Sequence, residues 1–505
     1  MPCRPSLKRK SIRHFAEHED KFRVCRKPRL TCPCDNQSLK FLVTDGDYQK
    51  MPGTKIEPGQ FERIADFVFS AGPDIPEYTL RRMALLLVDT LGVAAGAAKL
   101  ESGILAREHA VDFIAAGKAD HAARLMFDGR PASIPGAAFA AASQIDNLDG
   151  HDGYNPTKGH IGCAVVPALF AFAEHHPDLT GREALQALVM SYEFSARAAI
   201  SLHATVSDYH TSGAWNALGV AALGCRLRNA DTEKLRHAIG IAEYHGPRSQ
   251  MMREIDNPTM LHDGSGMGAL TGSMACLLAE RGFTGAPAIT IEAAEVGDHW
   301  RDLGSLWTVD LNYIKPYPIC RWAHAAIDAT RLLMRQHGFC AGDVKAVTVH
   351  AFAEAARLYR GMPQTTSEAQ YSLAFAVATM LFHGTIAPQH ISGYGLKDVK
   401  IAALLPSINI VEAKRHSSRF PLARWSDVEI ILKDGRKVSS GDVHARGGPE
   451  APMDEAEIEA KFHTMTASAL SPKRAEEIWA MRERLLQPGV KLRELSDLIY
   501  AECDV

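Results

Sequence analysis

Long stretches rich in alanine, leucine and glycine, rather than alternating strand patterns, dominate this chain from residue 61 onward. In residues 78–98 (YTLRRMALLLVDTLGVAAGAA) apolar side chains occur almost all round the helical surface. Such a pattern is typical of a buried core helix rather than of an amphipathic surface helix. No strand-like alternation is obvious before about residue 343, so this half is expected to be multihelical. Helical periodicity predicts further helices over residues 182–203, 214–227, 232–244, 266–281 and 323–337.

The pattern then changes to a mixture of strands and helices. Residues 344–350 and 428–439 alternate as strands do, and Asp434-Gly435 is a strong hairpin-turn signal. Helices are predicted between them, over 367–383 and 396–405, and after them, over 454–466 and 472–486. The predicted fold is mainly α, a large multihelical domain with an inserted small α+β lid domain. We expect the helical domain at 57–315, the lid at 316–451 and C-terminal helices rejoining the helical domain at 452–505.

The N-terminal segment differs from the rest. Residues 1–40 contain eleven Lys and Arg against four acidic residues, and they include Cys3, Cys25, Cys32 and Cys34. The segment lacks the apolar core of a secretory signal, and Cys32-Pro-Cys34 does not have the spacing of an ordinary zinc site. We therefore expect residues 1–56 to be a disordered basic extension.

Composition narrows the class of protein. The 505 residues, 46% hydrophobic and 23% charged, are ordinary for a globular chain of two or three domains. A net charge of -3 argues against a nucleic-acid partner. No window approaches the roughly 18 uninterrupted apolar residues of a membrane span, so no membrane partner is expected. Scattered cysteines outside the N-terminal segment are typical of reduced thiols, and we expect a cytoplasmic protein.

Ionisable residues are concentrated in one glycine-rich loop. Residues 148–153 (LDGHDG) and 157–162 (TKGHIG) contain Asp149, His151, Asp152, Lys158 and His160. Apolar helices are predicted on both sides, over 135–146 and 164–174. Polar groups on a loop held by buried elements are frequently catalytic, because burial shifts their pKa values. The alternative is an ordinary helix-to-helix turn, which uses the same residue types.

Further segments also place ionisable residues beside predicted helices or among glycines. His210 precedes a helix of small residues, His262 lies in a glycine-rich segment, and Lys315, Cys320 and Arg321 lie within 314–324. Each has a structural alternative: a capping histidine, a buried thiol or a solvated surface charge. The glycines of 258–272 lack the ending of a phosphate-binding loop and more simply allow close helix packing. Together these cations and imidazoles, with Asp149 as the nearest base, suit a polycarboxylate substrate.

The same residues also allow a metal site. Asp149, His151, His160, His210 and His262 offer ligand atoms, but no local His-x-x-x-His or Cys-x-x-Cys pair anchors them. We therefore predict no metal.

In this order, the segments resemble the MmgE/PrpD superfamily, which includes 2-methylcitrate dehydratase, cis-aconitate decarboxylase and iminodisuccinate epimerase. The resemblance covers residues 57–490. It rests on 89–92 (DTLG), 137–153, the GHIG of 159–162, 192–197, 209–211 (YHT), 261–264 (LHDG), 315–318 (KPYP) and 368–372 (EAQYS). It implies a large all-α domain, a small α+β lid, a site between them, a homodimer, and no metal or organic cofactor.

The resemblance also implies roles for single residues. Asp149 matches the first aspartate of the family's Leu-Asp-Phe-Asp-Asp-Thr motif, and His160 and His210 match histidines of its His-Pro and His-Pro-Thr elements. His262 falls on a Lys-or-His position, and residues 315–320 fall where the lid begins. The chain departs from the pattern at His151 and Gly153, where the family has aspartate and threonine. It also has Thr259 where some members have lysine and Ile161 where the family has proline.

The resemblance implies a lyase, a hydro-lyase similar to 2-methylcitrate dehydratase that removes an α-proton from a hydroxy-di- or tricarboxylate. Catalysis is assigned to Asp149, His160 and His210, with His210 or Asp149 as base and His160 as acid or oxyanion partner. The same proton abstraction serves an epimerase/isomerase or a decarboxylase, and the departures also allow a non-catalytic binding protein. The residues expected to bind substrate are His151, Lys158, His262, Lys315 and Arg321.

Overall fold

The computed structural model describes residues 55–70, 72 and 74–504. Helices predominate and strands are few, so the mainly α class is confirmed. From Thr54 onward the chain forms one compact unit. The disordered extension predicted for residues 1–56 lies outside the described residues except for Lys55 and Ile56.

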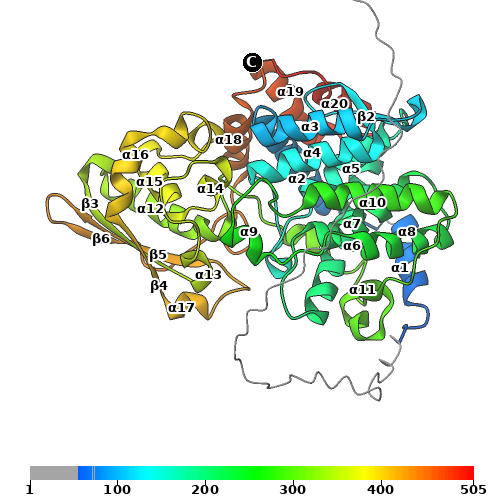
Figure 1. Cartoon of the computed structure of the whole chain (residues 1–505), viewed down its shortest axis with the longest axis horizontal. Coiled ribbons are helices and arrows are strands. Elements are labelled where there is room, and N and C mark those ends of the chain that lie inside the picture. Colours follow the sequence, from blue (N-terminus) through cyan, green and yellow to red (C-terminus); the bar gives the residue numbers. More distant parts are fainter. Residues whose placement is uncertain (1–54, 71, 73, 505) are drawn as a thin grey trace, which may run out of the picture. The chain divides into compact units, whose positions relative to one another are not determined.

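A layer of buried helices forms the centre of the helical part (Figure 1). Helix α2 (Glu77–Ala97) is buried on nearly all sides beyond its first turns, as its sequence predicts. Helix α10 packs against α7 and α4, α7 packs against α6, and α4 packs against α5 and α2. Their bounds are α4 Ile134–Leu148, α5 Gly162–Ala173, α6 Gly181–Thr205, α7 Gly213–Leu227 and α10 Ser265–Glu280.

Shorter elements surround these helices. They include a two-stranded antiparallel sheet, β1 (Ala122–Arg124) with β2 (Pro131–Ser133). No strand pattern was recognisable before residue 343, because three-residue strands are too short to show alternation. The remaining helices here are α1 Gln60–Ser70, α3 Glu101–Phe113, α8 Thr232–His245, α9 Met252–Asp256 and α11 Ile289–Glu292.

The mixed part contains the larger sheet. Strand β3 (Val344–Ala351) pairs parallel with β4 (Ile408–Glu412) and antiparallel with β5 (Trp425–Leu432), with Val347 opposite both Ile408 and Ile430. Strand β5 also pairs with β6 (Lys437–Ser439) and β7 (Val443–His444). The β5–β6 hairpin turns at Asp434-Gly435, where Gly435 has a φ of 90°, as expected from this dipeptide.

Helices cover this sheet. Helix α12 (His324–His337) contacts β5 and α15 (Leu373–His383). The helix predicted over 367–383 is instead two, α14 (Thr366–Gln370) and α15, because the Ser372 side chain caps α15 by accepting from the Phe375 N–H. The short helices α13 Ala353–Ala356, α16 Val399–Leu404 and α17 Lys414–Ser417 complete this part.

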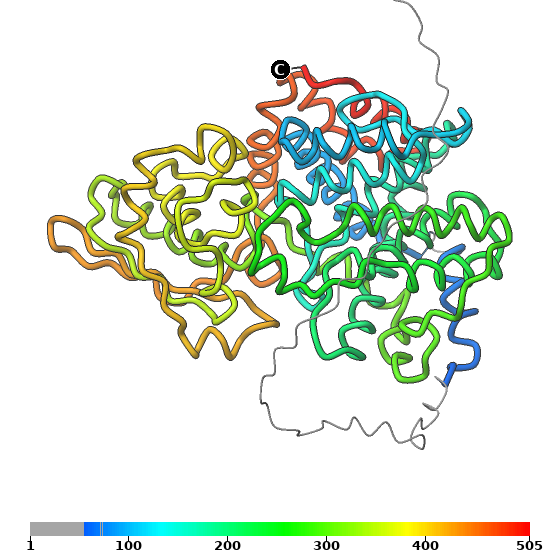
Figure 2. The backbone as a smooth tube through the Cα atoms, viewed as in Figure 1, coloured from blue at the N-terminus to red at the C-terminus, as the bar shows by residue number. Residues whose placement is uncertain are grey.

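The C-terminal helices lie against the helical part. Helices α18 (Glu455–Thr466) and α19 (Pro472–Arg484) both contact α2, and α20 (Leu492–Ile499) packs on α19. Figure 2 shows this segment, orange to red, beside the blue of α2. The division of the unit at residues 315 and 451 stays a prediction.

Among the described residues, no single helix combines the length and apolarity needed to cross a bilayer. One bent pair, Glu77–Ala97 with Glu101–Phe113 at 93°, passes by length and composition alone.

Candidate active site

The loop after α4 is fixed by contacts from distant parts of the chain. Helix α4 begins at a Ser133 cap, whose hydroxyl accepts from the Gly136 N–H at 3.1 Å, and ends before Asp149, which has a left-handed φ of 55°. Lys461 of α18 donates to the Gly150 carbonyl oxygen at 2.7 Å. Gly153 exchanges two backbone hydrogen bonds with Tyr313, at 3.0 and 2.8 Å. These contacts hold the loop between α18 and the segment leading to Lys315.

Asp149 and Lys315 form a buried ion pair. The Lys315 Nζ donates to the Asp149 carboxylate and, at 3.2 Å, to its carbonyl oxygen. Burial raises the pKa of Asp149 to about 6, although Lys315 opposes the rise. Burial disfavours the Lys315 ammonium, but Asp149, Tyr313 and Cys320 together outweigh this effect, so the pKa of Lys315 is raised. The Asp149 Oδ2 atom has no hydrogen-bond partner among the described residues, so it is available to accept a proton.

His160 presents an unprotonated ring nitrogen. Its Nδ1 lies 2.6 Å from the Asp152 carbonyl oxygen. A carbonyl oxygen only accepts, so Nδ1 holds the proton and Nε2 holds a lone pair. Nε2 lies 3.5 Å from Oδ2 of Asp263, whose other oxygen accepts from the Ser212 hydroxyl at 2.7 Å. Burial, and then Lys315, lowers the pKa of His160 to about 4, so the ring is neutral near pH 7.

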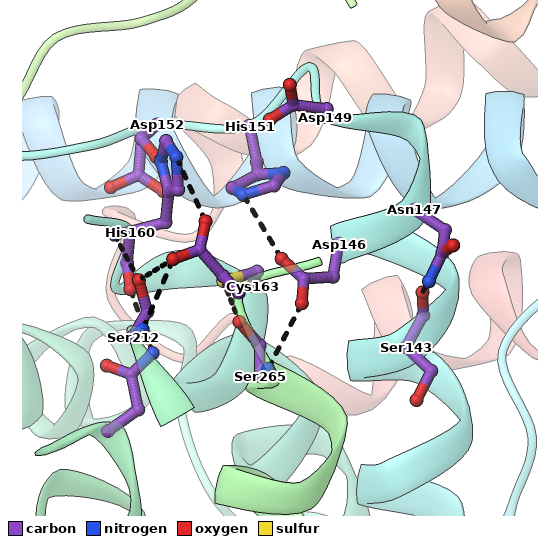
Figure 3. Close-up of polar contacts among 12 residues, drawn as sticks. Ser143, Asp146, Asn147, Asp149, His151, Asp152, His160, Cys163, Ser212 and Ser265 are labelled. Atoms are coloured by element: carbon purple, nitrogen blue, oxygen red, sulfur yellow. Dashed lines mark hydrogen bonds and ion pairs between the residues drawn. The ribbon is translucent and has the colours of Figure 1, made fainter. Parts of the chain in front are cut away.

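His151 is fully buried in the helical part, behind His160. Its Nε2 is 3.8 Å from Asp146 Oδ1, and its ring meets that of His160 edge-on with centroids 4.5 Å apart. In Figure 3, Asp146 lies between His151 and Ser265, whose N–H donates to Asp146 at 3.0 Å. Burial raises the pKa of Asp146 and lowers the pKa of His151, which favours the neutral form of both.

A small polar cavity joins residues from both parts of the unit. Five predicted site residues line it: Asp149, Lys158, His160, Lys315 and Arg321. The cavity holds about 30 Å³, while a single water needs roughly 10–15 Å³. A ligand larger than about two water molecules therefore enters only if the surrounding elements move apart.

Positive groups are concentrated in this cavity. Burial, and then Arg424, lowers the pKa of Lys158 to about 8, and the Lys158 Nζ lies 3.6 Å from the centroid of the Tyr209 ring. Burial also lowers the pKa of Arg424 to about 10. The Arg321 guanidinium stacks 4.2 Å from the Tyr313 centroid and donates to the carbonyl oxygens of Ala445 and Arg446. The positive charges of Lys158, Arg321 and Arg424 repel one another. An anion bound among them would relieve this repulsion, so its binding is favourable.

Three predicted site residues lie outside this cavity in the described chain. His151 is behind it, and His262 lines a neighbouring cavity of about 700 Å³, where burial lowers its pKa to about 4. His210 lines neither cavity, and its Nε2 is 3.8 Å from Asp208. Its backbone N–H donates to His203 at 3.1 Å, a structural contact.

Other cavity residues were not expected from the sequence. Asp263 and Tyr371 lie within the quoted motifs LHDG and EAQYS, so the motifs offered a signal for them. Glu254 and Arg424 lie in segments without any distinguishing pattern, on α9 and before β5. Only the packing of distant elements places them here.

Two groups of three side chains near the loop have ligand atoms close enough for a metal ion. They are Asp149, His151 and His160, and Asp146, His151 and Cys163, each with atoms within 4.8 Å of one another. The Asp149 carboxylate is already paired with the Lys315 ammonium, which would repel a cation. The electrostatics of the first group therefore fit a metal poorly, and the second lies in the interior behind the cavity.

Comparison with known families gives two adjacent matches. Residues 62–298 match the MmgE/PrpD N-terminal domain, and residues 317–487 match the MmgE/PrpD C-terminal domain. No curated protein matches the chain. Asp149, His160 and Glu254 lie in the first match, while Arg321, Tyr371 and Arg424 lie in the second. The cavity is thus built from both matched regions, with Lys315 in the short segment between them.

Proposed function

The chain belongs to the MmgE/PrpD family, and we propose that it is a lyase that dehydrates a hydroxy-di- or tricarboxylate similar to 2-methylcitrate. Membership supports a dehydratase- or lyase-like activity in general. The narrower proposal rests on one observation: a buried Asp149–Lys315 pair lines a cavity together with three further cations, Lys158, Arg321 and Arg424.

The proposed step is proton abstraction next to a carboxylate. Above about pH 6 Asp149 is ionised, and its unpartnered Oδ2 takes the α-proton. Negative charge then develops on the neighbouring carboxylate of the substrate. Lys315 and the other cations stabilise this charge in a small cavity between buried groups, where such interactions are stronger than in bulk water.

His160 has a different role in this proposal. Because its Nε2 holds a lone pair, it accepts a hydrogen bond from the substrate hydroxyl and orients it. A neutral imidazole with a pKa of about 4 is not a proton donor near pH 7. The proton for the leaving hydroxyl group must therefore come from another side chain.

A substrate screen tests this function. The purified protein is incubated with hydroxy-di- and tricarboxylates. Loss of the α-proton signal and growth of the vinyl or allylic signals of the unsaturated product are followed by ¹H NMR. Asp149→Asn and Lys315→Met should abolish product formation, whereas Lys345→Met, at an exposed position on β3, should not. Folded wild-type protein that turns over no member of the panel contradicts the proposal.

The same spectra also detect epimerised and decarboxylated products. The homodimer implied by the family resemblance stays a prediction, which sedimentation velocity measures directly.

A further inference from the structure

Glu254 lies on the short helix α9, between the polar cavity and the larger apolar one, and it lines both. Its Oε1 accepts from the Tyr371 hydroxyl at 3.3 Å. Its Oε2 is buried and has no hydrogen-bond partner in the part of the chain that the structure describes. A buried carboxyl oxygen without a partner at the wall of a substrate cavity is available for contact with substrate.

The surroundings of Glu254 favour its protonated form. Burial raises the pKa of Glu254 well above its usual range, and Asp263, Asp146 and Asp149 raise it further. The four cations of the same cavity have other contacts: Lys315 pairs with Asp149, Lys158 lies over the Tyr209 ring, and Arg321 and Arg424 donate to backbone carbonyl oxygens. A carboxyl group held neutral in this way can donate a proton, which an ionised one cannot.

Other groups of the cavity are weaker candidates for proton donation. His160 Nε2 holds no proton. Burial raises the pKa values of the Tyr313 and Tyr371 hydroxyls and of the Cys320 thiol, so these groups release protons less readily. An effective acid has a pKa nearer the working pH. Lys158, whose pKa is about 8, meets this condition, but its Nζ contacts the Pro156 carbonyl oxygen and the Tyr209 ring, whereas Glu254 Oε2 has no partner among the described residues.

We propose that Glu254 is the proton donor to the leaving hydroxyl group, an assignment that rests on the dehydratase function proposed above. In this step the Cα–H bond breaks and its proton goes to Asp149. The electron pair forms the C=C bond while the C–O bond breaks. The leaving oxygen takes a proton from Glu254 and departs as water. Asp149 is left protonated and Glu254 ionised, and exchange with solvent restores both.

Leaving-group chemistry distinguishes an acid from a structural residue. A hydroxyl group needs a proton in order to leave, whereas fluoride leaves as a stable anion. Glu254→Gln should therefore lower kcat for the β-hydroxy acid by about 10²–10⁴-fold, the usual scale for a lost general acid. The same variant should eliminate fluoride from the matching β-fluoro acid at nearly the wild-type rate.

Asp256→Asn is the matched control on the same helix. Its carboxylate pairs with Arg357 at 2.7 Å on the surface, away from both cavities. This variant should leave both reactions unchanged, which separates loss of the acid from disturbance of α9. Melting temperatures confirm that both variants fold.

Two results overturn the proton-donor role. One is a Glu254→Gln enzyme that dehydrates the hydroxy acid normally. The other is an equal loss of water and fluoride elimination while Asp256→Asn remains normal, which assigns Glu254 to positioning. If the wild-type protein eliminates neither water nor fluoride, the proposed dehydratase function is wrong, and the proton-donor role of Glu254 is rejected together with it. That failure is recognised from the wild type alone.

Discussion

The Lys315 ammonium donates to the Asp149 carboxylate across 166 residues of chain, and neither side chain is exposed to solvent. The pair joins the end of α4 to the segment between the two family-matched regions. Each partner compensates a charge that would otherwise be costly to bury. This contact therefore contributes both to the fold of the loop and to the chemistry of the cavity.

Removing only the lysine should destabilise the protein. In Lys315→Met the buried Asp149 loses its partner, and the free energy of unfolding should fall by about 3–5 kcal/mol, as for other broken buried pairs. Lys315→Met combined with Asp149→Leu should recover much of this loss, because no unpaired charge remains. Urea denaturation of the single and double variants measures both effects, and strictly additive losses would show that the two residues do not interact.

The dependence of kcat/KM on pH identifies the base. Asp149 has a pKa of about 6 and acts when deprotonated, so kcat/KM should fall about tenfold per pH unit below that pH and level off above it. It should fall again at higher pH, where Glu254 loses the proton that it donates. If kcat/KM instead begins to fall only near pH 4, the base is His160, whose pKa is about 4. The profile, measured where the protein remains folded, separates the two assignments.

The two histidines aligned with family motifs should behave differently. His160→Leu removes the lone pair that accepts from the substrate hydroxyl and should lower kcat/KM by about tenfold, the scale of one lost hydrogen bond. His210→Gln should leave kcat near the wild-type value, because His210 lines neither cavity. Circular dichroism checks that both variants fold. A large loss of kcat in folded His210→Gln would show that His210 takes part in catalysis.

Gly153, where the family resemblance implies threonine, has no room for a Cβ atom. A Cβ atom here would lie 2.7 Å from His160 Nδ1 and would overlap the Tyr313 hydroxyl. Gly153→Thr should therefore reduce activity and lower the free energy of unfolding by about 1–3 kcal/mol, as overpacking does. Gly117→Thr, where no atom lies within 4 Å of the added Cβ, is the control. A fully active, stable Gly153→Thr enzyme would refute this explanation.

The sequence predicted long helices better than it predicted the site. The apolar pattern of α2 and the Asp434-Gly435 turn act locally, so they could be recognised without tertiary information. Strands β1 and β2 are too short to show a period. The ion pair of Asp149 with Lys315 agrees with the grouping of charged motifs, but Glu254 and Arg424 reach the cavity only through packing between distant elements. His210 has the right residue type and motif, yet the fold places its ring beside Asp208.

Exchange of the substrate α-proton tests the central claim most directly. Wild-type protein is incubated in D₂O with each hydroxy-di- or tricarboxylate that it binds, with Asp149→Asn in parallel. The α-proton signal of the acid and the vinyl or allylic signals of the unsaturated product are followed by ¹H NMR. We predict that wild-type protein removes the α-proton and forms the unsaturated product, while Asp149→Asn binds the acid and leaves the α-proton in place. Tight binding by the wild type with the α-proton fully retained would contradict the account and identify a binding protein instead of a lyase.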